Sequence, residues 1–159
     1  EVKAIYEQLE KKFGMVPNVI KAMANSPGLL QGFVPFLGAV LSSSAVDAPL
    51  KELAILTTTK INGCKYCTAH QTVAGKRAGL TKEKIEALPD FNSPLLDEKE
   101  KAVVRFAKEV TERVSASEES INELRKYFNY SQIAELNLVV GAFNLLTRFA
   151  DTFKVDLER

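Results

Sequence analysis

The sequence predicts an all-α fold, a bundle of about seven to nine helices built by a single domain over residues 1–159. Apolar residues recur at helical spacing, as Val2, Ile5, Tyr6 and Leu9 do at the N-terminus. Proline, glycine and asparagine interrupt these periodic segments at short intervals. The alternating pattern that is typical of strands is weak throughout.

The breaks divide the chain into helical segments. The expected helices cover 2–14, 16–25, 29–41, 49–62, 64–79, 81–88, 97–114, 117–128 and 131–153. Pro35 should kink or divide the third of these helices, because proline has no amide hydrogen to donate. Asp47 is the expected N-cap of the fourth helix, and Ser117 and Ser131 should open the last two. The Thr57-Thr58-Thr59 run lowers helix propensity, so burial must stabilise the fourth helix.

Composition and charge exclude several classes of function. Apolar residues make up 46% of the chain, and 21 basic residues nearly balance 20 acidic ones. Without a basic tract, no nucleic-acid partner is expected. The apolar stretch from Ile133 to Ala150 contains Glu135 and Arg148, so no membrane partner is expected either. The N-terminus lacks the pattern of a signal peptide. With only two cysteines, we expect a cytoplasmic protein rather than a secreted disulfide scaffold.

A weak internal repeat relates two helical segments. The run 51–56, Lys-Glu-Leu-Ala-Ile-Leu, resembles the run 134–139, Ala-Glu-Leu-Asn-Leu-Val. An apolar-Asn pair follows each run, ending at Asn62 in the first copy and at Asn144 in the second. The second copy has no cysteines, so we expect Glu135 to be structural and paired with Arg148 or another cation.

The two cysteines lie together in the segment Cys64-Lys65-Tyr66-Cys67. Residues three apart on a helix share a face, so the two sulfurs can approach bonding distance. Gly63 places Cys64 at a helix start, where the helix dipole favours a thiolate and is expected to lower the thiol pKa. This pattern indicates redox chemistry.

Glu52 and His70 are the candidate proton carriers beside the thiols. His70 is the only histidine and follows Cys67 by three residues, about one helical turn. A neutral imidazole there can take a thiol proton, and an imidazolium can stabilise the thiolate. Glu52 precedes Cys64 by twelve residues on a mostly apolar helix face. Burial there would raise the pKa of Glu52 and make it a candidate base.

These residues resemble a known family. Glu52, the Cys64 to Cys67 segment, His70 and the run 74–80 are similar to the redox branch of the alkylhydroperoxidase D and carboxymuconolactone decarboxylase family. The resemblance covers most of the chain and is strongest over 50–80. It implies an all-helical fold that forms homo-oligomers, such as dimers, trimers or hexamers. It also implies a thiol peroxidase or disulfide reductase activity.

The resemblance also implies a role for each residue. Cys67 would attack the hydroperoxide substrate and become a sulfenic acid, and Cys64 would resolve it to a disulfide. Glu52 would be the base and His70 the proton relay. An external dithiol, either a lipoyl group or a thioredoxin-like protein, would reduce the disulfide, and no cofactor is implied. One position departs from the family pattern, because Gln71 stands where the best-known members carry their histidine.

Other interpretations remain open at this point. Cys64, Cys67, His70 and Glu52 could supply the four ligands of a structural zinc site in a non-redox oligomer. The chain could instead be a lyase of the carboxymuconolactone decarboxylase type, in which the cysteines are incidental. Tyr66 is more often a packing residue than a catalytic one. The apolar stripe of the third helix is expected in the core or at a subunit interface: Phe33, Phe36, Leu37 and Val40.

Overall fold

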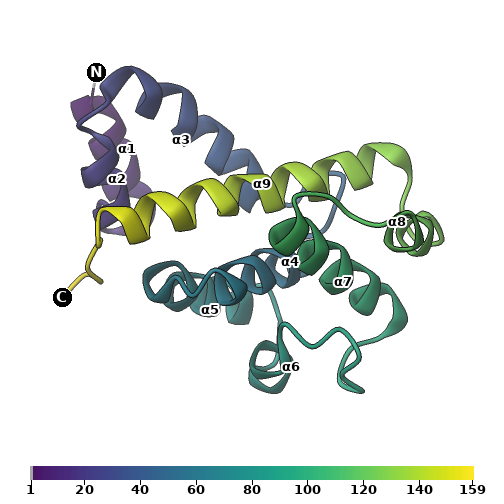
Figure 1. The fold of residues 1–159 in the computed structure, drawn as a ribbon. Coiled ribbons are helices and arrows are strands. Elements are labelled where there is room, and N and C mark those ends of the chain that lie inside the picture. The colour runs from purple at the N-terminus through teal and green to yellow at the C-terminus, as the bar shows by residue number, and fades with distance from the viewer. Residues whose placement is uncertain (1) are drawn as a thin grey trace.

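The computed structural model describes residues 2–159, which form nine helices and no strand (Figure 1). The all-α prediction is therefore confirmed. The helices are α1 (Val2–Phe13), α2 (Asn18–Met23), α3 (Pro27–Leu41), α4 (Ala48–Ile61), α5 (Lys65–Arg77), α6 (Lys82–Ala87), α7 (Glu98–Arg113), α8 (Glu118–Arg125) and α9 (Tyr130–Thr152).

Helix α4 is the centre of the fold and packs against α5, α7 and α9. Its three consecutive threonines are completely buried, as their weak helix propensity required. Thr57 Oγ1 donates to the Leu53 carbonyl at 2.7 Å, and Thr58 Oγ1 donates to the Ala54 carbonyl at 3.0 Å. Each hydroxyl thus makes a hydrogen bond within its own helix, which offsets the cost of removing it from water.

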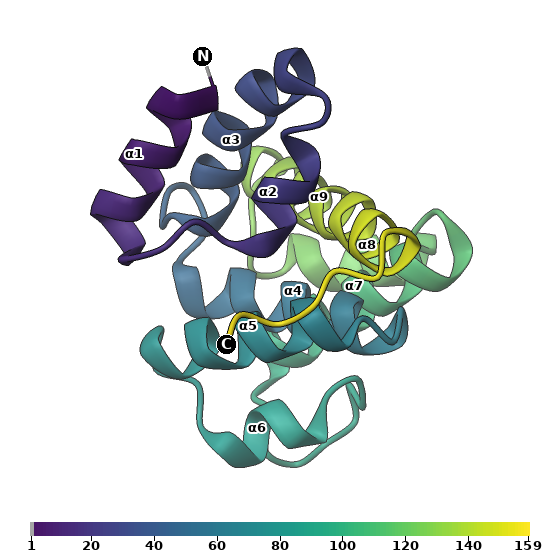
Figure 2. The same ribbon diagram turned by 90° about the vertical axis from the view of Figure 1, so that its left-hand side faces the viewer.

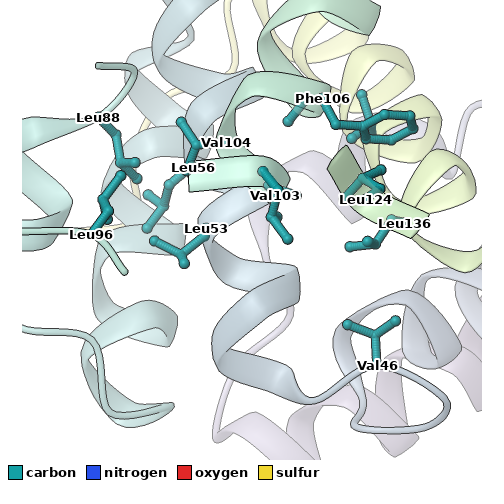
Figure 3. Close-up of a cluster of buried hydrophobic side chains, with 14 of the residues drawn as sticks. Val46, Leu53, Leu56, Leu88, Leu96, Val103, Val104, Phe106, Leu124 and Leu136 are labelled. Carbon is teal, nitrogen blue, oxygen red and sulfur yellow. The ribbon is translucent and has the colours of Figure 1, made fainter. Parts of the chain in front are cut away.

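The first of two hydrophobic clusters joins α4 to α6, α7, α8 and α9. Figure 3 shows side chains of this cluster from α4, α7, α8 and α9, together with Val46, Leu88 and Leu96 from the connecting segments. Its fully enclosed members include Leu53, Val103, Val104, Leu124 and Leu136. This cluster fixes α4, the helix that carries Glu52, against α7 and α9.

The second cluster packs the N-terminal helices against α9 and the start of α5. Ile20, Leu30 and Phe143 are buried members of this cluster. Cys64 and Cys67 belong to it as well. The candidate thiols are therefore part of a hydrophobic core rather than of an exposed loop.

Helix α9 contributes to both clusters and crosses the whole molecule in Figure 1. It is long and apolar enough to cross a membrane by length and composition alone. Its buried residues, however, contact α3, α4, α5 and α7. This is the burial pattern of a core helix.

Two helix starts and one proline differ from the sequence-based expectation. Helix α3 continues through Pro35 without division. Ser117 caps α8 as predicted, with the Ser120 amide donating to its hydroxyl at 3.1 Å. Helix α9, in contrast, is capped by Asn129, because Gln132 completes a capping box there. Asp47 holds the N-cap position of α4 but makes no capping hydrogen bond with its side chain.

Glu135 pairs with a different cation from the Arg148 named in the sequence analysis. Glu135 pairs with the buried Lys51 at 3.6 Å, and it accepts a hydrogen bond from the Val46 amide at 2.6 Å. Arg148, the cation named from the sequence, donates to Asn144 on its own helix instead. Glu135 is structural, as expected, and it fastens the segment before α4 to α9.

Large apolar side chains are exposed on α3 and on α9. Leu29 is 77% exposed and Phe36 is 38% exposed on α3, while Leu138 and Leu145 are 60% and 50% exposed on α9. Val40, in contrast, is buried in the second cluster. A helix that is apolar on nearly all sides, as α3 is, is normally covered by other protein.

Candidate active site

A tight turn between α4 and α5 places the two cysteines. Gly63 adopts φ +68°, a conformation that favours glycine, directly after Asn62 ends α4. The Cys64 amide donates to the Thr59 carbonyl and the Gly63 amide to the Lys60 carbonyl, both at 3.1 Å. These two bonds form a Schellman motif, which ends one helix and starts the next within two residues.

The side chain of Asn62 anchors this turn to α9. Its amide nitrogen donates to Asn144 Oδ1 and to Thr147 Oγ1, each at 2.9 Å. Asn62 and Asn144 are the matched asparagines of the two repeat copies, so the copies contact each other beside the thiols. The cysteines are thereby held at a fixed position against α9.

Cys64 and Cys67 come together at the start of α5, and both are free thiols. Cys64 is the N-cap residue, and its sulfur accepts a hydrogen bond from the Cys67 amide at 3.2 Å. Cys64 is completely enclosed, and Cys67 is 5% exposed. The predicted position of Cys64 at a helix start is therefore correct.

The expected low thiol pKa is not found. Burial raises the pKa of Cys64, although the hydrogen bonds from Cys67 act in the opposite direction. Burial also raises the pKa of Cys67, and the neighbouring Cys64 and the Asp151 carboxylate add to that rise. Desolvation thus outweighs the helix dipole, and the thiols need a base to become thiolates.

Glu52 lies buried on α4 with 4% of its surface exposed. Burial raises its pKa from 4.5 to about 8, so the carboxyl is largely protonated at neutral pH. Its Oε2 atom has no hydrogen-bond partner within the described residues. The raised pKa agrees with the sequence-based expectation for this residue, and a buried carboxyl without a partner is typical of proton-handling sites.

His70 contacts the C-terminal tail. Its Nε2 atom lies 2.7 Å from Oε2 of Glu158, a residue 88 positions further along the chain. Figure 2 shows this tail, in yellow, crossing α5. Glu158 was missed by the sequence reasoning, and no local motif around it could have revealed this contact.

Tyr66, between the two cysteines, joins the same contact. Its hydroxyl donates to Glu158 Oε1 at 2.7 Å and accepts from the Val19 amide at 3.2 Å. Its ring lies against the His70 ring with the centroids 4.6 Å apart. Tyr66 is 7% exposed, so it packs in the core, as expected, while its hydroxyl reaches a carboxylate.

The residues proposed as zinc ligands do not form a metal site. Across residues 2–159, no group of three or more histidine, cysteine, aspartate or glutamate side chains is placed to hold a metal ion.

Gln71, at the position of the family histidine, has a buried Oε1 atom without a hydrogen-bond partner. Glu52 and Gln71 therefore both present unsatisfied oxygens inside the protein.

Two shallow depressions flank the turn at Gly63. The larger, of about 530 Å³, has Cys64 in its lining. Its other lining residues are Lys60, Gly63, Lys65, Thr68 and Ala69. The second, of about 330 Å³, is lined by Asn62, Thr147, Arg148, Asp151 and Thr152. The first depression therefore borders the turn at Cys64, whose own surface is enclosed, and does not reach Cys67.

The family model described as "Carboxymuconolactone decarboxylase family" matches residues 27–109, more than half of the 159-residue chain. The chain belongs to this family. Among curated proteins, the uncharacterized protein YdfG of Bacillus subtilis (strain 168) is 25% identical over 114 residues. That match covers 67% of this chain and 75% of YdfG.

Solved structures share the family fold. An uncharacterized peroxidase-related protein from Silicibacter sp. TM1040 is 26% identical with a TM-score of 0.86, covering 98% of this chain and 84% of that one. A Ralstonia eutropha JMP134 protein described as an alkylhydroperoxidase AhpD core is 19% identical with a TM-score of 0.85, covering 99% and 85%. The debrominase Bmp8, solved with 2,3,4-tribromopyrrole, is 21% identical with a TM-score of 0.84, covering 99% and 85%. The predicted family and fold are thus confirmed.

Proposed function

We propose that this family member is a thiol-dependent peroxidase or disulfide reductase that works through Cys64 and Cys67 in a reducing compartment, the cytoplasm. The observation that carries the proposal is the pair of free thiols at the start of α5, where the Cys67 amide donates a hydrogen bond to the Cys64 sulfur. The family match and the likeness to a peroxidase-related protein favour an enzyme of this kind.

The proposed reaction has three balanced steps. The Cys67 thiolate attacks the terminal oxygen of a hydroperoxide, the O–O bond breaks, and the released oxygen takes a proton to leave as water or an alcohol. The Cys64 thiol then attacks the Cys67 sulfenic acid, forming the disulfide and releasing water. An external dithiol, lipoyl or thioredoxin-like, finally reduces the disulfide and becomes oxidised itself.

Two groups are proposed to move the protons. Glu52, with a pKa near 8, would accept a proton when ionised and return it to the leaving oxygen when protonated. His70 would relay protons between the thiols and solvent, because its ring is 30% exposed. The rate of thiol oxidation should then rise as the pH approaches 8, and Glu52→Gln should remove that rise.

The test follows both thiols during oxidation. Free thiols and intact mass are measured before and after one equivalent of hydrogen peroxide or an alkyl hydroperoxide, and again after adding a dithiol. We expect both thiols to be lost, with two hydrogens per chain, and then to be restored. Cys67→Ser should abolish peroxide consumption, whereas Cys64→Ser should leave a sulfenic acid that dimedone traps.

The same experiment separates the alternatives. Thiols that do not react with either peroxide contradict the proposal. Activity of the lyase type that survives alanine at both cysteines would show that the cysteines are incidental. A third variant, Ser93→Ala, serves as a control, because Ser93 lies outside the α4–α5 site.

We also propose that the chain assembles into a homo-oligomer through the exposed apolar side chains of α3 and of α9. These side chains are Leu29 and Phe36 on α3 and Leu138 and Leu145 on α9. Sedimentation velocity is the measurement, and a monomer at micromolar concentration would contradict the proposal.

A further inference from the structure

The tail carboxylate of Glu158 is bound by three donors from two helices. The Asn18 amide, at the start of α2, and the Tyr66 hydroxyl each lie 2.7 Å from Oε1, and His70 Nε2 lies 2.7 Å from Oε2. A further bond, from Asn18 Nδ2 to the Asp156 carbonyl at 3.0 Å, holds the same tail segment. Glu158 is therefore built into the protein rather than lying loosely on it.

The electrostatics keep Glu158 ionised. Burial alone would raise its pKa, but the hydrogen bonds from Asn18, Tyr66 and His70 lower it to about 2. Tyr66 and His70 on α5 are the titratable groups that face this carboxylate, and α2 contributes a backbone amide. The side chain is only 16% exposed, so solvent screens the charge weakly.

The geometry points to Glu158 as a positioning residue that acts on the thiol pair through His70. This inference rests on the proposed redox function. Because the carboxylate is acceptor-only, it requires the proton of a neutral His70 to lie on Nε2. The other ring nitrogen, Nδ1, then carries a free lone pair and can accept a proton.

In this arrangement His70 can act as the base that the buried Cys67 thiol needs to form a thiolate. His70 stands one helical turn after Cys67, so the two Cβ atoms lie roughly 5–6 Å apart. Removing the Cys67 proton yields the thiolate, and the proton passes to His70 Nδ1, directly or through one water. The carboxylate at 2.7 Å then stabilises the resulting imidazolium by charge and by its hydrogen bond.

Tyr66 links the positioning residue to the thiol segment itself. Its ring packs on His70, and its hydroxyl shares the Glu158 carboxylate. The tail thus orients two side chains of α5, one between the cysteines and one just beyond them. Val19 and Asn18 of α2 complete the frame by donating backbone amides to Tyr66 and Glu158.

The kinetic test is a double-mutant cycle on fully reduced protein. The rate constant for thiol oxidation by hydrogen peroxide is measured for wild type, Glu158→Gln, His70→Gln and the double variant. The amide of Glu158→Gln can donate to Nε2 and so reverse the tautomer of His70. We expect Glu158→Gln to lower the rate by about 10- to 100-fold and to add nothing in the His70→Gln background.

A matched control removes a charge from the same tail. Asp156→Asn leaves the Asp156 carbonyl and the Glu158 carboxylate in place, so its oxidation rate should stay at the wild-type value. An unchanged rate for Glu158→Gln, or an equal loss in both backgrounds, would overturn the inference. If wild type itself does not oxidise, the proposed function fails, and the spectroscopic test below still decides the pairing.

The spectroscopic test uses the single histidine of the chain. Labelling histidine with ¹⁵N gives the resonances of one imidazole ring, and their shifts report its tautomer. We expect the Nε2–H tautomer in neutral wild-type protein, and its loss in Glu158→Gln. A neutral wild-type ring with its proton on Nδ1 would overturn the inference even if the variant failed to fold.

Discussion

Glu52 and Glu135 occupy the same place in the two similar runs of the chain, yet their surroundings are opposite. Glu135 is partly buried, but hydrogen bonds from Ser44 and Val46 and the charge of Lys51 lower its pKa. Glu52 is buried without comparable partners, and its pKa rises to about 8. The sequence context is alike, so the difference comes from the donors that the fold brings to each carboxylate.

The comparison shows how two runs of similar sequence can take different roles. In the second copy, the carboxylate binds a cation and fastens a loop, which consumes its hydrogen-bonding capacity. In the first copy, the carboxyl keeps an unsatisfied buried oxygen on α4, the helix that packs against α5. A satisfied carboxylate stabilises a structure, whereas an unsatisfied one near neutral pKa remains free to exchange protons.

The largest expected effect on stability comes from removing Glu135, the carboxylate whose hydrogen bonds are satisfied. Glu135→Ala leaves the Lys51 ammonium, whose side chain is 1% exposed, without its counter-charge. We expect the free energy of unfolding to fall by about 3–4 kcal/mol, measured by urea denaturation. The double variant Lys51→Met with Glu135→Leu should recover most of this loss, and a single-variant loss below about 1 kcal/mol would contradict the account.

Removing the Glu52 carboxyl, which has an unsatisfied oxygen, should instead raise the free energy of unfolding. The folded pKa of Glu52, about 8, lies above the ordinary value of 4.5, so ionisation opposes folding and wild-type stability falls as the pH rises between these values. Glu52→Gln should lack this fall, so its free energy of unfolding relative to wild type should rise by about 3 kcal/mol between pH 5 and pH 8. Urea denaturation at pH 5 and pH 8 measures the difference, and parallel curves for the two proteins would refute it.

The smallest effect is expected at Gln71, a neutral counterpart of Glu52. Its buried Oε1 atom also lacks a partner, but no charge is involved. Gln71→Leu should therefore change the free energy of unfolding by no more than about 1 kcal/mol, with stabilisation as the expected direction. A large loss in the same denaturation experiment would mean that this amide is satisfied in solution.

Local patterns predicted most of the fold. All nine helices were expected close to their observed positions, because periodicity, Asn62-Gly63 and the capping residues act over a few residues. Asn129 was missed as a cap because Ser131 offers a similar signal two residues later. The family followed from the spacing of Glu52, the cysteines and His70, which places them on two consecutive helices.

The electrostatics of the site could not be predicted in the same way. The helix-start rule correctly placed Cys64, but tertiary burial reversed the direction of its pKa. Lys51 was not identified as the partner of Glu135, and Glu158 was not identified as the partner of His70, because 84 and 88 residues separate them in the chain. Charges brought together by the fold leave no local pattern in a single sequence.

The bond between the Asn18 amide and Glu158 also has a consequence for the order of assembly. It joins residues 140 positions apart, and closing a flexible loop of that length costs about 4 kcal/mol of chain entropy. The tail should therefore dock only after α4, α7 and α9 have packed and brought the two segments close. Newly made chains would therefore pass through a stage with a packed core in which Tyr66 and His70 still lack their hydrogen bonds to Glu158.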